Sequence, residues 1–511
     1  MRKENSTKNF FSGIIPYFIL AILGFVRIDI FMKYLGVEVF ALNQLFFQLF
    51  AYISLIEAGV GSLIVQLYYR LLVKNDTSQI NRIFTASKKL LRKISIIIII
   101  IGVAISFGLK MLTNNNMSLL FMQLVFILFI LKCVIDYLMF SPRFVLQADQ
   151  KIYKINFKIS MYRIIEILIE IILLYLYGNY ILILISAIVI RILGNLHINK
   201  KIYKEYPWLN EVPNDEIVPI KGMKYIIGHK IAGAVYNNTD ILVISAFLSP
   251  LKVAIYSSYN YIIKFITDAV YIFASSITAS FGNVMYKENQ QDQRTIFEEM
   301  NALFLFMAMF FTIVIFHVTD SFITLWIGQD KIMTEMGFIL MVSILFFGIM
   351  RRPLLIMRDT KGLFKETQIM AIIEASINVG LSIILIQKFD LVGVLLATII
   401  ASVLTSFWYL PNYVYHHIFK ASVFSYYMKQ FVVILLTILI CYGSAYLYPM
   451  QNINNLLIWF IYCCIYSIIL LIILIGINYC LFGYFRRTCY KAFSILRKAL
   501  KGDGKNAQNI S

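Results

Sequence analysis

The chain alternates between long apolar segments and shorter polar ones. The apolar segments are about 20 residues long, the length at which an α-helix crosses a hydrocarbon core of about 30 Å. They lack the alternation of apolar and polar positions that marks a transmembrane β-strand. The pattern predicts an all-α polytopic membrane protein with about 14 transmembrane helices. The expected spans are Phe10 to Met32, Val39 to Leu67, Ile94 to Leu112, Ser118 to Phe140, Phe157 to Tyr177, Tyr180 to Ile198, Lys224 to Leu248, Val253 to Met285, Asn301 to Ile323, Glu335 to Met357, Thr367 to Ile386, Leu391 to Tyr415, Tyr427 to Tyr448 and Leu456 to Cys480.

One long polar stretch divides this series. Residues 199–223 form a cytoplasmic linking loop between two sets of six spans, so the sequence predicts an N-lobe at 1–198 and a C-lobe at 224–420. Two further spans at 421–481 and a basic cytoplasmic tail at 482–511 follow. Because six is even, both sets enter the membrane in the same orientation, which permits parallel repeats around a central cavity and alternating access. No sequence similarity between the two sets is visible.

Basic residues are distributed unevenly among the polar segments. Apolar residues make up 60% of the chain, charged residues only 14%, and the net charge is +19. Lys and Arg accumulate in the N-terminus, in every second loop and in the tail, which predicts that both termini are cytoplasmic. The tail from Phe485 to Lys501 has the pattern of an amphipathic helix on an anionic inner leaflet. Membrane lipids therefore account for the positive charge, and no nucleic acid partner is expected.

Basic residues also lie inside the apolar segments. Each costs about 2.5 to 3.5 kcal/mol at the centre of a membrane helix, so several together indicate a hydrated, cationic cavity that binds an anion. Lys264 lies near the middle of its span, and its alternative role is an ion pair with Asp268 one helical turn later. Arg27 is the second candidate, and its alternatives are an ion pair with Asp29 or snorkelling to the outer membrane surface. The full set is Arg27, Lys132, Arg163, Arg191, Lys230 and Lys264.

The remaining basic residues in the spans have competing interpretations. Arg191 precedes a polar helix end, so snorkelling to the membrane surface is the alternative to a cavity contact. Arg163 shares a helix face with Glu166 and Glu170, which favours an ion network between helices. Lys132 likewise has an acid, Asp136, four residues later.

Acidic residues in the spans raise the question of ion coupling. The candidates are Asp240, Glu57 and Glu374, because buried carboxylates have raised pKa values and bind hard cations through oxygen. The alternative is a salt bridge to a cavity arginine or, for Glu374, exposure near the inner end of its span. A proton or sodium ion is therefore the only cofactor-like species expected.

Several classes of chemistry are disfavoured by the sequence. The outward loops are short and contain no paired carboxylates or histidine clusters, which argues against a membrane glycan polymerase or glycosyltransferase. No Gly-rich phosphate-binding loop is present, and the six cysteines show no CxxC spacing. The sequence therefore predicts a protein that is not an enzyme and has no metal site.

Several pieces of the chain resemble a known family. The longest is RIDIFMKYLGVEVFALNQLFFQLFAYISLIEAGVGSLIVQLYYRLL, from Arg27 to Leu72. The others are LQADQKIY (Leu146 to Tyr153), NNTDILVISAFLSPLKVAIYSSYNYI (Asn237 to Ile262), SFGNVMYKE (Ser280 to Glu288), ITLWIGQD (Ile323 to Asp330), RRPLLIMRDTKGLFKET (Arg351 to Thr367) and EASINVGLSIILIQKFDLVGVLLATII (Glu374 to Ile400). In this order they resemble the polysaccharide repeat-unit flippases of Gram-positive type, the Wzx-like branch of the multidrug/oligosaccharidyl-lipid/polysaccharide (MOP) exporter superfamily.

The resemblance implies two six-helix lobes around a cavity, and a substrate made of a short oligosaccharide on undecaprenyl pyrophosphate. It implies a bacterial cytoplasmic membrane, with glycan polymerase machinery as a candidate partner. It also implies that Arg27 contacts the substrate. Arg binds pyrophosphate oxygens bidentately and Lys acts as a point charge, so the pyrophosphate-binding candidates are Lys264, Arg27, Arg191 and Arg163. Tyrosine stacks on sugar rings, and the sugar-facing candidates are Tyr256, Tyr259 and Tyr261.

An alternative function within the same superfamily is a MATE-type drug/cation antiporter. Such a protein would require a cavity dominated by acids, whereas the charges in the middle of these spans are mostly basic.

Overall fold

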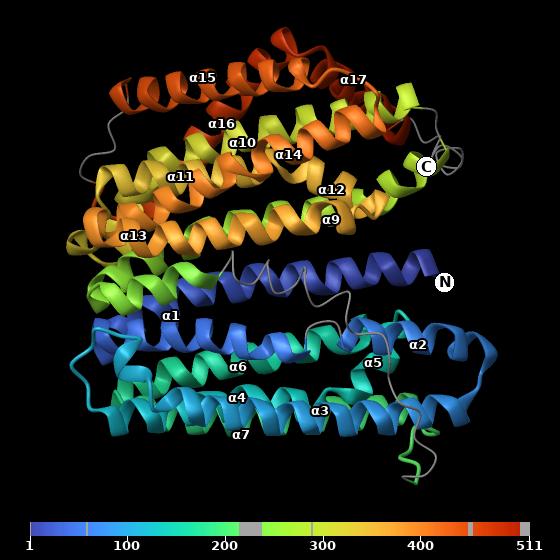
Figure 1. The fold of residues 1–511 in the computed structure, drawn as a ribbon, viewed down its shortest axis with the longest axis vertical. Helices are drawn as coiled ribbons and strands as arrows, with labels where there is room; N and C mark the ends of the chain where they lie inside the picture. Colours follow the sequence, from blue (N-terminus) through green and yellow to red (C-terminus); the bar gives the residue numbers. More distant parts are fainter. Residues whose placement is uncertain (1, 58–59, 214–237, 288–289, 448–452, 501–511) are drawn as a thin grey trace. The chain divides into compact units, whose positions relative to one another are not determined.

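The structure is a computed structural model, drawn in Figure 1. It describes residues 2–57, 60–213, 238–287, 290–447 and 453–500. Regular structure within these ranges is entirely helical, which confirms the all-α fold class predicted from the sequence. The chain forms two compact units, Met1–Ala254 and Ile255–Ser511. Their boundary falls inside helix α9 (Pro250–Lys287), which is further along the chain than the predicted linking loop.

The first unit is a bundle of long helices. In Figure 1, α1, α3, α4, α6 and α7 run side by side, and the shorter α2 and α5 lie at one end of the bundle. Helix α1 packs on α6, α3 packs on α4, and α7 packs on both α4 and α6. The bounds are α1 (Arg2–Ile53), α2 (Val60–Lys74), α3 (Thr77–Ser106), α4 (Leu119–Met139), α5 (Ser141–Ala148), α6 (Tyr153–Tyr177) and α7 (Tyr180–Glu205), with a further short helix at Asn238–Phe247.

Helix α1 contains the first two predicted spans. Gly36 separates them with a backbone φ of 82°, a left-handed conformation that favours glycine. The second span was expected to continue to Leu67, and this prediction was wrong, because the helix ends at Ile53. A 3-10 turn, Ser54–Glu57, follows, in which the Ser54 hydroxyl donates to the Ala51 carbonyl at 2.8 Å. Apolar periodicity alone does not reveal such a local polar break.

The second unit contains the remaining long helices. Helix α10 packs against α11, α15, α16 and α17, and α13 packs against α11 and α14. Within α13, Asp390 has a φ of 55° and separates the predicted eleventh and twelfth spans. The bounds are α9 (Pro250–Lys287), α10 (Gln290–Ile327), α11 (Glu335–Met350), α12 (Arg352–Lys361), α13 (Phe364–Leu404), α14 (Ser406–Tyr413), α15 (Phe424–Leu447), α16 (Leu456–Leu481) and α17 (Gly483–Leu500).

The two units share a break after their fourth long apolar segment. Helix α4 ends at Met139 and α11 ends at Met350, and a short helix, α5 or α12, follows each. Pro142 and Pro353 stand three residues beyond these ends, at the first or second position of the short helix. Proline suits that position because it has no backbone N–H to satisfy there. This repeat was not visible when the two halves of the sequence were compared.

Length and apolar composition qualify seven of the described helical segments as membrane spans. Helix α6 is long enough as well, but it carries Arg163, Glu166 and Glu170. Several helices extend past the predicted spans; α7, for example, continues to Glu205 rather than ending at Ile198. The chain is a multi-pass membrane protein. The helices that carry charged residues within their apolar segments are the ones in which a functional site is expected.

Candidate functional site

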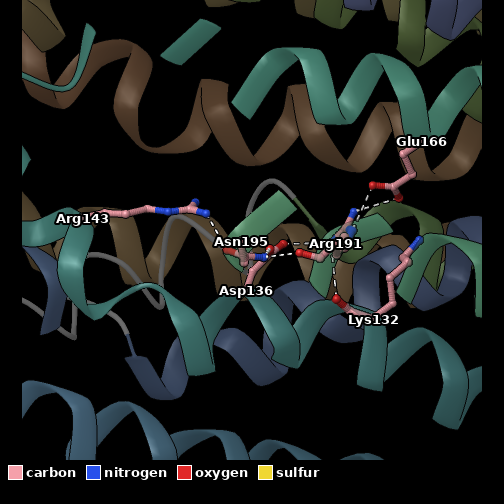
Figure 2. A network of polar contacts seen from close by, with 6 residues as sticks. All are labelled: Lys132, Asp136, Arg143, Glu166, Arg191 and Asn195. Atoms are coloured by element: carbon pink, nitrogen blue, oxygen red, sulfur yellow. Dashed lines mark hydrogen bonds and ion pairs between the residues drawn. The ribbon is translucent and has the colours of Figure 1, made fainter. Parts of the chain in front are cut away.

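Charged and polar side chains from four helices meet inside the first unit, as Figure 2 shows. They come from α4, α5, α6 and α7, and α7 packs against each of the other three. We call this group the N-unit cluster, and it consists of Lys132, Asp136, Arg143, Glu166, Arg191 and Asn195.

Arg191 of α7 is the centre of the N-unit cluster. Its Nε and Nη2 donate to the two carboxylate oxygens of Glu166 on α6, at 3.0 and 3.2 Å. Its Nη1 donates to Asp136 Oδ2 at 2.9 Å and to the Lys132 carbonyl at 3.5 Å, both on α4. The planar guanidinium thus joins three helices and binds both carboxylates of the cluster.

Asn195, one helical turn after Arg191, extends the network toward α5. Its amide nitrogen donates to Asp136 Oδ1 at 2.9 Å, and its amide oxygen accepts a 2.5 Å hydrogen bond from Arg143 Nη2. The adjacent Gly194 allows α6 to approach closely, because a Cβ there would lie 2.9 Å from the Tyr162 ring. The close approach of α6 and α7 positions Glu166 to reach Arg191.

Two cations of the N-unit cluster have no carboxylate of their own. Lys132 is 5% exposed, and its ammonium lies 4.8 Å from the Phe129 ring centroid. Arg143 is also buried, stacks over Phe140 and has an Nε without a hydrogen-bond partner among the described residues. Neither side chain forms an ion pair in the described part of the chain, since both carboxylates bind Arg191. The cluster therefore carries more positive than negative charge.

Arg27 lies on α1 and pairs with Glu170 of α6, with 2.8 Å between Nε and Oε1. Because Glu170 follows Glu166 by one helical turn, α6 presents two acids to arginines from two different helices. Arg163, on the same helix, is exposed and lies outside the N-unit cluster. Of the predicted pyrophosphate ligands in this unit, Arg27 and Arg191 are therefore paired internally, whereas Arg163 forms no ion pair with the described residues.

In the second unit, Lys264 is an exposed side chain on α9. From the sequence, Asp268 was the alternative ion-pair partner of Lys264, but no ion pair connects these two described residues. Lys264, the residue of this unit that was predicted to bind pyrophosphate, is thus accessible.

The three predicted sugar-facing tyrosines lie on the same helix. Tyr256 and Tyr259 are buried, and Tyr261 is half-buried. The Tyr259 hydroxyl donates to Asp320 Oδ1 at 2.5 Å and accepts from the Met333 N–H at 3.2 Å. Both buried rings are packed within the protein, so sugar contact by Tyr256 and Tyr259 stays a prediction that would require a conformation in which a ring face is open.

Glu374, a predicted coupling acid, is buried in the second unit rather than exposed. Its Oε1 accepts from Arg351 Nη1 at 3.0 Å and from the hydroxyls of Ser402 and Ser406 at 2.9 and 3.0 Å. Arg351 also donates to the Ser406 hydroxyl at 2.8 Å. We call these four residues the C-unit cluster, in which one cation meets one anion.

The other predicted acids lie in the first unit. Asp240 is half-buried and follows Thr239, whose hydroxyl is 2.5 Å from that of Tyr52. Glu57 is half-buried at the end of the 3-10 turn.

Lys230 lies outside the described residues. No group of three or more His, Cys, Asp or Glu side chains suited to a metal occurs in the described ranges.

Sequence reasoning missed Arg143, Asn195 and Arg351 as members of these clusters. It also assigned Asp136 to Lys132 on the same helix, whereas Asp136 binds Arg191 and Asn195 of α7. Proline was the feature of the sequence that could have pointed to both arginines, because Arg143 follows Pro142 and Arg351 stands two residues before Pro353. A basic residue beside a helix break at the end of a span is interpreted as a loop residue until its partners are known.

Comparisons with solved structures give the same fold. Lipid II flippase MurJ in an inward closed conformation matches with a TM-score of 0.69 and 18% identity, over 91% of this chain and 98% of that one. The MATE multidrug transporter DinF-BH matches at 0.58 and 15%, over 81% and 96%. An inward-facing multidrug resistance MATE family transporter of the MOP superfamily matches at 0.57 and 14%, over 76% and 93%. No protein-family model and no curated protein matches the chain. The chain therefore has the fold that is shared by this lipid II flippase and these MATE transporters.

Proposed function

We propose that the protein is a flippase for undecaprenyl-pyrophosphate-linked oligosaccharide repeat units. It would move them across the bacterial cytoplasmic membrane by alternating access, for the synthesis of a surface polysaccharide. The observation that carries this proposal is the excess of buried cations in the N-unit cluster, where Lys132 and Arg143 have no carboxylate partner among the described residues.

The physical argument is one of charge compensation. A buried cation without a partner is costly, and a protein that retains it gains most when a ligand supplies the missing negative charge. A pyrophosphate group does so, and its oxygens accept several charge-assisted hydrogen bonds from arginine and lysine. The fold shared with a lipid II flippase supports this function over that of an enzyme. A drug/cation antiporter is less well supported, since the free charge of the cluster is positive.

The predicted ligands divide into two groups under this proposal. Lys264 and Arg163 are exposed and would contact the pyrophosphate directly. Arg27 and Arg191 are held by Glu170 and by the cluster acids, so they would reach the substrate only by exchanging partners. We propose Asp240, Glu57 and Glu374 as acids through which a proton or sodium gradient would drive the exchange. Both termini would face the cytoplasm, and glycan polymerase machinery would be a partner.

Flipping in proteoliposomes tests the proposal. The full-length protein is reconstituted with a lipid-pyrophosphate-linked oligosaccharide, and a membrane-impermeant probe reports the sugar on the opposite leaflet, with and without proton or sodium gradients. We expect movement that depends on the protein. Gradient-driven efflux of a cationic dye without lipid movement would support the antiporter instead.

A substitution at Lys264 sharpens this test. Lys264→Gln removes an exposed cation, so the protein should fold normally while flipping falls about tenfold, the loss expected from about 1.4 kcal/mol of charge-assisted hydrogen bonding. The matched control is Lys252→Gln, which removes the same charge near the start of the same helix. Equal flipping by both variants would remove Lys264 from the substrate path.

A further inference from the structure

A cavity with a charged rim lies within the Ile255–Ser511 unit, and none of the site residues considered so far lines it. Its volume is about 740 Å³, and it is formed by α10, α15, α16 and α17. This volume lies in the range of about 300 to 1,000 Å³ that is typical of small-molecule sites. The residues lining it that bear on its chemistry are Glu298, Asn301, Lys429, Tyr484, Arg486 and Arg487.

The charge of this cavity is positive. Its acid, Glu298, is already bound by Lys429 at 2.8 Å and by the Tyr415 hydroxyl at 2.7 Å. Arg486 and Arg487 form no ion pair with the described residues and are exposed at the rim. Two guanidinium groups are therefore available to an anion that enters the cavity.

An unsatisfied amide lies on the wall of the same cavity. Asn301 of α10 is 1% exposed, and neither its amide nitrogen nor its amide oxygen has a hydrogen-bond partner within the described residues. Buried polar groups are nearly always hydrogen-bonded, so a side chain with both ends unsatisfied indicates a polar group missing from its surroundings. The amide is independent of the two arginines, and it too indicates a polar ligand.

The position of the cavity at the end of a membrane span identifies the kind of ligand. Helix α16 has a mean hydropathy of 2.9 and is only 11% buried within the protein, as expected for a helix that faces lipid. It ends at Leu481, and α17, which carries Arg486 and Arg487, begins at Gly483. The arginines therefore lie where the hydrocarbon core gives way to phospholipid headgroups.

The same cavity has an apolar side. Met428 and Val432 of α15 and Leu481 of α16 line it and are exposed. In addition, α17 is anchored to the bundle, because the buried Phe485 ring lies 5.0 Å from that of Phe306 on α10. The cavity thus combines cations and an amide at its polar side with apolar side chains that would contact acyl chains.

We propose that this cavity binds the headgroup of an anionic phospholipid. Arg486 and Arg487 bind the phosphate, Asn301 donates to or accepts from a polar headgroup atom, and the acyl chains lie against α15 and α16. This site would tie the function of the protein to the anionic lipid of one leaflet, independently of the lipid-linked substrate.

Native mass spectrometry of the full-length protein in detergent tests the proposal, with dioleoyl phosphatidylglycerol as the probe and dioleoyl phosphatidylcholine as the neutral comparison. We expect tighter binding of phosphatidylglycerol, weakened about tenfold by Arg487→Gln through loss of a charge-assisted hydrogen bond. The matched control is Lys491→Gln, one turn along α17, because Lys491 binds Glu299 and does not line the cavity. Ser425→Trp, which fills the cavity from its exposed rim without a change of charge, should weaken binding as well.

Three outcomes would overturn the proposal. Equal binding of the two phospholipids would remove the charge argument, and equal losses in Arg487→Gln and Lys491→Gln would indicate general attraction to a basic helix. Displacement of phosphatidylglycerol by polyprenyl phosphate, or by inorganic phosphate alone, would assign the cavity to a different ligand. None of these results depends on flipping, so they leave the proposed transport function to be judged separately.

Discussion

The N-unit and C-unit clusters occupy comparable places and differ in charge. Both lie beside the proline break that follows the fourth long helix of their unit, at α4–α5 and at α11–α12. Both contain an arginine–glutamate ion pair, Arg191–Glu166 in the N-unit cluster and Arg351–Glu374 in the C-unit cluster. The C-unit cluster contains one cation, one anion and two hydroxyls, whereas the N-unit cluster contains three cations and two acids.

This difference bears on which cluster has charge available for an anionic substrate. Arg351 and Glu374 compensate each other's charge, and the Ser402 and Ser406 hydroxyls donate two further hydrogen bonds to Glu374 Oε1, so the C-unit cluster carries no excess charge. Lys132 and Arg143 leave positive charge in excess in the N-unit cluster. Excess charge inside a membrane protein is costly, and this cost is the basis on which we propose the N-unit cluster as a binding site for the pyrophosphate.

The largest effect is expected from breaking the centre of the N-unit cluster. Arg191→Met leaves Glu166 and Asp136 without their cation, so the free energy of unfolding should fall by about 3 kcal/mol, the lower end of the range for buried pairs. The lower end applies because the Arg191 side chain is 25% exposed. Denaturant unfolding of the purified protein in detergent measures this loss. Arg163→Met, a change at an exposed site, is the control, and similar stabilities for both variants would contradict the central role of Arg191.

A smaller effect is expected in the C-unit cluster. Glu374→Leu removes the carboxylate that binds Arg351, but that arginine is 25% exposed and keeps its hydrogen bond to Ser406. The loss of unfolding free energy should be about 1 to 2 kcal/mol. Glu374→Gln retains an acceptor for the serines and should lose less. If the same unfolding measurement gave a greater loss for Glu374→Leu than for Arg191→Met, the ranking of the two clusters would be reversed.

The smallest effect on stability, and the most informative one, is expected at Lys132. Lys132→Met replaces a cation without a carboxylate partner by an apolar side chain of similar length, so the unfolding free energy should change by less than about 1 kcal/mol. Flipping in proteoliposomes should nevertheless fall about tenfold, because the positive charge that attracts pyrophosphate is reduced. A variant that lost stability as severely as Arg191→Met would show instead that Lys132 is a structural member of the cluster.

Helix-forming segments were the most predictable part of this protein. Apolar length alone placed α4, α15 and α16 to within a few residues, because a membrane span has no alternative to satisfying its own backbone hydrogen bonds. The break after Ile53 was missed, because the apolar pattern continues across the 3-10 turn and gives no local signal of it. The candidate site was predictable only as a list of charged residues, because the acids that bind Arg27 and Arg191 are distant from them in sequence.

The sequence by itself determined that the chain is an all-α membrane protein with basic residues inside its spans. Both conclusions follow from composition and local periodicity, which need no knowledge of neighbours. Only the tertiary structure decided that Arg191 binds Asp136 and Glu166, that Glu374 is neutralised by Arg351, and that Lys132 and Arg143 lack an acid within the described ranges. The physical reason is that an ion pair depends on distances of a few ångströms between side chains of different helices, and these distances are fixed by helix packing.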